Sequence, residues 1–247
     1  EIYKNPQIRA KDVNDAFADP EVKAIFSTIG GDDSVRMLPY LDKELIRKNP
    51  KIVMGYSDTS TLLTFCNQLG LVTFNGPSIM AGFSQIRSLP PEFVQHVKTI
   101  LFENPDTYSY QPYPSYFEGY QDWSKPENVG LVKNEQKHDG WHWVQGSRAV
   151  QGQLFGGCIE VLQYFLNGTK FWPHGDFWNG KILFLETSEE KPSVSMVKYT
   201  LRGLGMQGVF DRISGIVLGR ARDYSAEEKQ KLDKAAVTIV SKEFGHP

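Results

Sequence analysis

One serine of this sequence lies where enzymes commonly place a nucleophile. Ser57, in the stretch MGYSDTSTLL, follows a short apolar run and precedes a second apolar stretch with helical spacing. The apolar run is expected to be a parallel strand, so Ser57 would lie at the carboxyl edge of a sheet, where doubly wound folds bind ligands. Ser, Asp and Thr before a helix are also its usual N-cap residues. The residues alone leave both interpretations open, helix cap and nucleophile.

The same turn could stabilise a developing negative charge. The backbone N–H of Asp58, at the start of the expected helix, would point with the helix dipole toward an oxyanion. The turn does not match the G-x-S-x-G pattern of α/β-hydrolases, because Gly55 fits the first glycine but Thr59 stands in place of the second. The α/β-hydrolase family is therefore not favoured.

A serine nucleophile needs a general base. The five histidines of the chain are His96, His138, His142, His174 and His246. His138 and His142 are four residues apart, but the glycine between them indicates a turn, not a helical metal pair. His246 lies in the glycine-led turn FGHP, which could present an imidazole. Glu186 ends the apolar run KILFLE, where it could orient a histidine or simply begin the solvated loop TSEEKPS.

Helical and strand patterns alternate along the chain, which predicts an α/β fold. We expect a parallel-sheet N-terminal domain, flavodoxin-like or Rossmann-like, and a second α/β domain at the C-terminus. In the second domain the stretch GGCIEVLQYFLNGT is expected to be a helix that ends at Gly168. A later helix, which begins near Ser225, carries a capping-box pattern with Glu228. The predicted boundaries are 1–103 for the N-terminal domain, 104–146 for an aromatic-rich linker or loop, and 147–247 for the C-terminal domain.

Several motifs occur in an order that resembles one family of serine peptidases. They are GGDDSVRMLPYLD, NPKIVMGYSDTSTL, FNGPS, GQLFGGCIEVLQYFLNGTKFWP, GKILFLETSEE and FGHP, and they extend from about residue 9 to the end. Together they are similar to the LD-carboxypeptidases and the microcin C self-immunity proteins. The turns IGGDD and GGC are closer to the microcin-immunity branch. That branch implies hydrolysis of an amide between a peptidyl or aspartyl group and a nucleotide.

The resemblance also implies a site. A Ser-Glu-His triad maps onto Ser57, Glu186 and His246, and an oxyanion hole maps onto the backbone N–H groups of Gly31 and Asp58. It implies a cytoplasmic homodimer without metal or cofactor. The chain begins without Met and ends in mid-pattern, and family members have further segments at both ends, so we expect residues beyond both.

Composition narrows the choice of partner. The chain has 27 Lys and Arg against 29 Asp and Glu, a net charge of −2, so neither nucleic acid nor an anionic membrane is favoured. Two cysteines without a C-x-x-C pair fit a reducing cytosol. No apolar stretch is long enough for a membrane span. A small substrate is therefore expected.

Two alternatives to the peptide-nucleotide hydrolase stay open. One is an LD-carboxypeptidase acting on cytosolic muropeptides, and the other is a non-catalytic nucleotide-binding module. The aromatic-rich stretch between Tyr108 and Trp143 bears on this choice, because aromatic rings can stack on a nucleobase. Trp141 and Trp143 are the predicted contacts to a nucleotide leaving group, although the rings could equally cover a domain junction.

Overall fold

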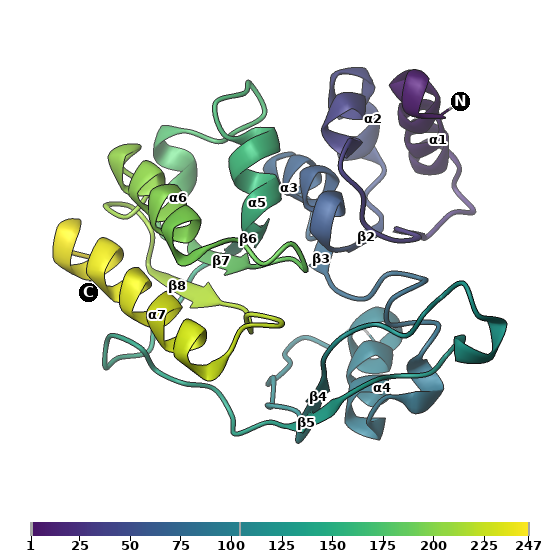
Figure 1. The fold of residues 1–247 in the computed structure, drawn as a ribbon. Helices are drawn as coiled ribbons and strands as arrows, with labels where there is room; N and C mark the ends of the chain where they lie inside the picture. Colours follow the sequence, from purple (N-terminus) through teal and green to yellow (C-terminus); the bar gives the residue numbers. More distant parts are fainter. Residues whose placement is uncertain (1, 104, 247) are drawn as a thin grey trace. The chain divides into compact units, whose positions relative to one another are not determined.

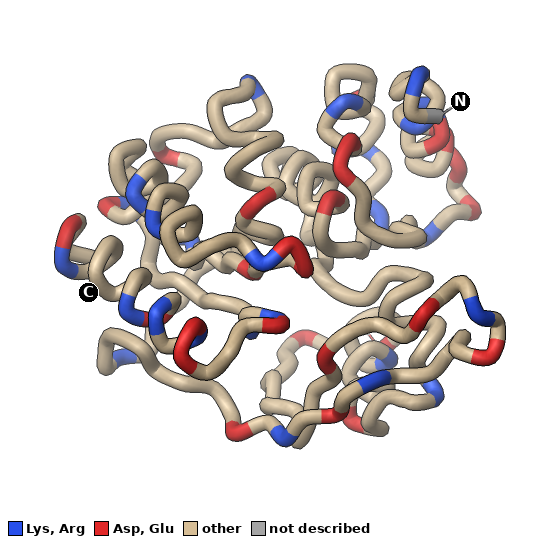
Figure 2. The backbone as a smooth tube through the Cα atoms, in the orientation of Figure 1, with Lys and Arg blue, Asp and Glu red and all other residues tan. Residues whose placement is uncertain are grey.

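The computed structural model describes residues 2–103 and 105–246, which form two compact units (Figure 1). The first unit combines Glu1–Ser78 with Val144–Pro247, and the second is Ile79–Trp143. The expected domain boundaries at 103 and 147 stay predictions. In both units Lys and Arg are interspersed with Asp and Glu along the backbone (Figure 2).

Two parallel sheets form the framework of the first unit. The strands of one are β1 (Ala24–Phe26), β2 (Ile52–Gly55) and β3 (Phe74–Asn75), in that order. The strands of the other are β6 (Leu154–Cys158), β7 (Ile182–Glu186) and β8 (Gly215–Leu218), in that order. Because strands alternate with helices in both, the predicted α/β fold with two parallel-sheet parts is confirmed.

The helices of the first unit follow the expected pattern. They are α1 (Pro6–Ala18), α2 (Lys43–Lys48), α3 (Ser60–Gln68), α5 (Ile159–Val161), α6 (Val194–Met206) and α7 (Ala226–Ala236). The first unit also contains shorter helical segments. They include the 3₁₀ helices η1 (Ile2–Lys4), η2 (Ser34–Tyr40), η3 (Ser57–Thr59) and η8 (Gly175–Trp178), and the π-helical turns η7 (Leu162–Leu166) and η9 (Val237–Glu243). The predicted capping box of α7 is confirmed, since Ser225 and Glu228 bond each other's backbone N–H.

One local prediction was wrong. The stretch GGCIEV was expected to be helical throughout, but its first three residues end strand β6 and the helix begins at Ile159. The cause is a close approach between strands: a Cβ on Gly156 would lie 1.7 Å from the carbonyl oxygen of Phe184 on β7. Only glycine allows β6 to pair with β7 at this position.

A single hydrophobic core joins the two sheets of the first unit. Phe17, Val53 and Leu62 are buried around the first sheet, and Phe155 and Leu183 around the second. Helix α3 contacts both β2 and β6 (Figure 1). The end of β2 is thus held close to the end of β6.

The second unit contains the aromatic-rich stretch. Its elements are α4 (Pro91–Lys98), the 3₁₀ helices η4 (Ile86–Ser88) and η6 (Pro126–Asn128), the π-helical turn η5 (Thr99–Glu103) and the antiparallel strands β4 (Ser115–Phe117) and β5 (Glu135–Lys137). The ring of His96 on α4 stacks on Tyr108, with centroids 4.9 Å apart, and bonds the Tyr113 hydroxyl through Nδ1. The tyrosines therefore pack on a helix of their own unit.

Within the described residues, 2–103 and 105–246, no helix is both long and apolar enough to cross a bilayer.

Candidate active site

Ser57 occupies a strained turn between strand β2 and helix α3. Its φ is 56°, in the left-handed region that residues other than glycine seldom adopt. Such a conformation costs about 1–3 kcal/mol and persists only where the surrounding structure imposes it. Tyr56 before it is extended, so the chain reverses direction within one residue as the strand ends. The connection between β2 and α3 is therefore a tight turn.

The cap interpretation receives no support from the local geometry. The N-cap of η3 is Tyr56 and that of α3 is Thr59, and neither makes a side-chain cap hydrogen bond. Ser57 is the first residue of η3, not a residue that caps it. Its hydroxyl is therefore not explained as a helix cap.

The Gly30–Gly31 turn after β1 packs directly on Ser57. A Cβ on Gly30 would lie 2.8 Å from Oγ and 2.9 Å from Cβ of Ser57, closer than real side chains approach. A Cβ on Gly31 would lie 3.1 Å from Oδ2 of Asp58. The two turns predicted to form the oxyanion hole thus come together at the carboxyl edge of the first sheet.

The side chain of Asp58 has a structural role in this turn. It is buried, its Oδ2 accepts from the backbone N–H of Ser34 at 3.0 Å, and the Ser34 hydroxyl donates to the Asp58 carbonyl at 2.8 Å. Burial raises the pKa of the carboxyl, while the bonds from Ser34 act in the opposite direction. These contacts fix the start of η2 against the serine turn.

Glu186 ends β7 at the carboxyl edge of the second sheet. Burial, followed by the charges of Glu160 and Glu189, raises its pKa to about 7. Among the described residues its buried Oε1 has no hydrogen-bond partner. A buried carboxylate oxygen normally accepts a hydrogen bond, so this atom is suited to an N–H donor that binds there.

A short series of contacts links Ser57 to Glu186. Ser60, one helical turn after Ser57, accepts a hydrogen bond from the backbone N–H of Cys158 at 3.1 Å through Oγ. Cys158 ends β6 and is the register partner of Glu186 on β7. The structure therefore brings the carboxyl edges that carry Ser57 and Glu186 together through α3.

His246 is not brought to these two residues. It lines a cavity of about 570 Å³ together with Ile213 and Ser214, which precede β8. Ser214 bonds Lys181, which precedes β7, so this cavity lies at the amino edge of the second sheet. Glu186 is five residue steps along the strand from Lys181, or about 16 Å at about 3.3 Å per residue.

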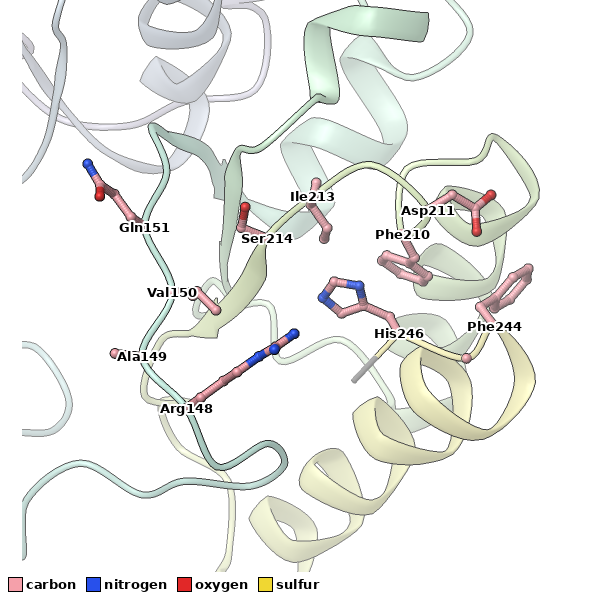
Figure 3. Close-up of a pocket in the computed structure, with 11 residues that line it drawn as sticks. Arg148, Ala149, Val150, Gln151, Phe210, Asp211, Ile213, Ser214, Phe244 and His246 are labelled. Carbon is pink, nitrogen blue, oxygen red and sulfur yellow. The ribbon is translucent and has the colours of Figure 1, made fainter.

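The surroundings of His246 are polar on one side. The side chains of Arg148 and His246 extend into the same space (Figure 3). The Nε2 atom of His246 is buried and has no hydrogen-bond partner within the part of the chain that the structure describes. The role of His246 as general base thus stays a prediction that this conformation does not assemble.

The remaining sequence candidates lie elsewhere. His174 is exposed at the N-cap of η8 in the first unit, and His96, His138 and His142 belong to the second unit. Trp141 and Trp143 also belong to the second unit, where 66% and 77% of their surfaces are exposed. In the described ranges no cluster of three or more His, Cys, Asp or Glu side chains is arranged to hold a metal ion.

Sequence reasoning missed four residues of this region: Gly30, Ser60, Glu160 and Ser188. The GG pair before Asp32 was a signal for Gly30, since a glycine pair after a strand often marks a close approach. Glu160 and Ser188 interact across 28 positions of the chain. No local pattern signals such a pair.

A strained serine at the carboxyl edge of a parallel sheet, facing a glycine turn, defines a hydrolase-like α/β site. Residues 1–76 match the LD-carboxypeptidase N-terminal domain, and residues 151–247 match the LD-carboxypeptidase C-terminal domain. The chain belongs to this peptidase family, as the sequence motifs predicted.

Among its relatives is the microcin C7 self-immunity protein MccF of Escherichia coli, 31% identical over 89% of this chain and 63% of that protein. An MccF-like protein from Streptococcus pneumoniae, solved in complex with AMP, is 30% identical with a TM-score of 0.82, over 97% of this chain and 73% of the other. MccF in complex with aspartyl sulfamoyl adenosine is 28% identical with a TM-score of 0.77, over 95% and 70%. The chain spans just under two thirds of the length of its first curated relatives.

Proposed function

We propose that this protein hydrolyses the amide between a peptidyl or aspartyl group and a nucleotide, with Ser57 as nucleophile. The observation that carries the proposal is the strained turn at Ser57, whose φ of 56° does not arise from a helix-capping role. Strain of this kind is concentrated at functional sites. The likeness to MccF, whose solved complex holds aspartyl sulfamoyl adenosine, supports this substrate class.

In the proposed reaction, Ser57 Oγ attacks the amide carbonyl carbon while a histidine accepts the hydroxyl proton. The backbone N–H groups of Gly31 and Asp58 stabilise the oxyanion, an interaction whose loss typically costs about 100-fold to 1,000-fold in rate. The histidine then donates the proton to the leaving nitrogen. Water hydrolyses the acyl-enzyme by the same steps in reverse. Glu186 accepts a hydrogen bond from the histidine and stabilises its charged form.

His246 is the proposed base. It could serve only after its ring leaves the cavity at the amino edge of the second sheet, because Glu186 ends the opposite edge. Substituting His246 by Ala therefore tests this assignment separately from the assignment of Ser57.

The activity test compares two substrates, an aspartyl-adenylate analogue and a tetrapeptide muropeptide. Ser57→Ala is expected to abolish hydrolysis, whereas Ser195→Ala, an exposed serine on α6, is expected to leave it unchanged. Cleavage of the muropeptide alone would favour the LD-carboxypeptidase alternative, which the family match also supports. Nucleotide binding without turnover, unchanged in Ser57→Ala, would favour a binding module.

The exposed rings of Trp141 and Trp143 support a further part of the proposal, a stacking contact with the nucleobase. Stacking on an aromatic ring contributes about 1–3 kcal/mol per base. Replacing the contacting Trp by Ala should weaken binding of the adenylate substrate and spare substrates without a base. Equal losses for both substrates would remove this contact from the proposal. A cytoplasmic homodimer is likewise proposed from the family resemblance.

A further inference from the structure

Glu160 ties together two segments that flank the proposed catalytic carboxylate. It lies in the first turn of α5, directly after β6. Its Oε1 accepts from the Ser188 hydroxyl at 2.6 Å and from the Ser188 backbone N–H at 3.1 Å, and its Oε2 lies 3.5 Å from the Cys158 thiol. One side chain thus connects the end of β6 with the turn that follows β7.

Glu186 lies between the two ends of this connection. It is the register partner of Cys158 and precedes Ser188 by two residues. Ser188 in turn organises its own turn, since its hydroxyl accepts from the backbone N–H of Glu190 and its carbonyl accepts from that of Lys191. Movement of Ser188 would therefore displace the residues that immediately follow Glu186.

We infer that Glu160 is a positioning residue of the proposed site, which holds Glu186 in place through Ser188 and Cys158 and sets the charge that surrounds it. Only the expected effect of Glu160 on catalysis rests on the proposed function. The connection itself is a property of the fold.

The electrostatic part of the inference concerns the titratable groups that interact with Glu186 or Glu160. Glu186 interacts with Glu160 from α5, with Glu189 from the turn after β7 and with Cys158 from β6. Tyr224, from the segment before α7, interacts with Glu160 and Glu228 and with the side chain of Thr187. Figure 2 shows acidic residues gathered where β7 ends and α5 begins. Burial and then the charge of Glu160 raise the pKa values of Glu186 and Tyr224, whereas burial, the charge of Glu186 and then that of Glu160 raise the pKa of the Cys158 thiol. Glu160 thus makes the ionised form of Glu186 less favourable.

Two substitutions separate the mechanical role from the electrostatic one. Glu160→Gln keeps a carbonyl oxygen that can accept from Ser188 but removes the charge. Glu160→Ala removes both. If Glu160 only filled space, neither substitution would alter the titration of Glu186.

The first measurement is a carbon-13 NMR titration of the Glu186 carboxyl in the intact protein. Glu160→Gln should shift the midpoint of Glu186 to lower pH by several tenths of a pH unit or more. Glu227→Gln, an exposed residue of α7 paired with Lys231, is the matched control and should leave the midpoint unchanged. An unchanged midpoint in Glu160→Gln would overturn the electrostatic role.

The second measurement is hydrolysis of the aspartyl-adenylate analogue across pH. The acid limb of kcat/KM in Glu160→Gln should move with the Glu186 midpoint, and Glu160→Ala should lower kcat at least 10-fold with little change in KM. Wild-type kcat in Glu160→Ala would overturn the positioning role. If wild type itself hydrolyses nothing, the proposed function fails. In that case the inference about Glu160 is still decided by the NMR titration and by the hydrogen-exchange rate of the Ser188 backbone amide in Glu160→Ala, because neither measurement requires hydrolysis.

Discussion

Replacing Glu186 by Gln should stabilise the protein at alkaline pH. The pKa of this carboxyl rises from its ordinary 4.5 to about 7 in the folded chain, chiefly because of burial. Between these two values the folded protein binds more protons than the unfolded chain, so the group's contribution to stability falls as pH rises. Gln cannot ionise and avoids this loss.

The size of the effect follows from the same values. A difference from 4.5 to about 7 corresponds to about 3 kcal/mol at about 1.36 kcal/mol per pH unit. That full difference applies only above both pKa values. We therefore expect Glu186→Gln to exceed wild type by about 3 kcal/mol at pH 8.5 and by less than about 1 kcal/mol at pH 5.

Urea unfolding at pH 5 and pH 8.5 measures the difference. Trp172 and Trp178 are buried in the same unit as Glu186, so their fluorescence follows its unfolding. Glu190→Gln, exposed in the turn after β7, is the control and should change stability by no more than about 0.5 kcal/mol at either pH. An equal effect of Glu186→Gln at both pH values would refute the argument, because it would show an unperturbed carboxyl.

Three further predictions concern the serine turn and its proposed base. Gly30→Ala should lower kcat about 100-fold in the hydrolysis assay while the protein stays folded by circular dichroism, because its Cβ would displace Ser57. Ser57→Gly should be inactive but about 1 kcal/mol more stable than Ser57→Ala in urea, because glycine adopts a φ of 56° without strain. His246→Ala should lower kcat at least 1,000-fold if His246 is the base. Wild-type activity in that variant would assign the base to another residue.

The strands that carry the site were predictable because each local pattern agrees with the final fold. Ser57 follows the apolar strand β2 after one intervening residue, and Glu186 is the last residue of β7. Parallel strands place such residues at the carboxyl edge of their sheet. The capping box at Ser225 is likewise a purely local feature. Such elements require no knowledge of distant partners.

Contacts between distant segments were not predictable in the same way. The bond between Glu160 and Ser188 depends on the register of β6 and β7. The strand conformation of the GGC stretch depends on the approach of Phe184, which no feature of that stretch reveals. The place of His246 depends on where the helical segment from α7 through η9 ends relative to β8. In each case the deciding partner is remote in sequence.

Two of the residues proposed for catalysis, Ser57 and Glu186, each have a feature that is unfavourable for stability. Ser57 holds a strained φ, and Glu186 keeps a buried carboxyl with an unpartnered oxygen. Both features oppose folding, and both lie at carboxyl edges that α3 brings together. Selection for stability alone would favour glycine at position 57 and a neutral side chain at position 186. Features that oppose folding are expected where function requires them, so their occurrence at two carboxyl edges linked through α3 favours a reaction site there over a purely structural turn.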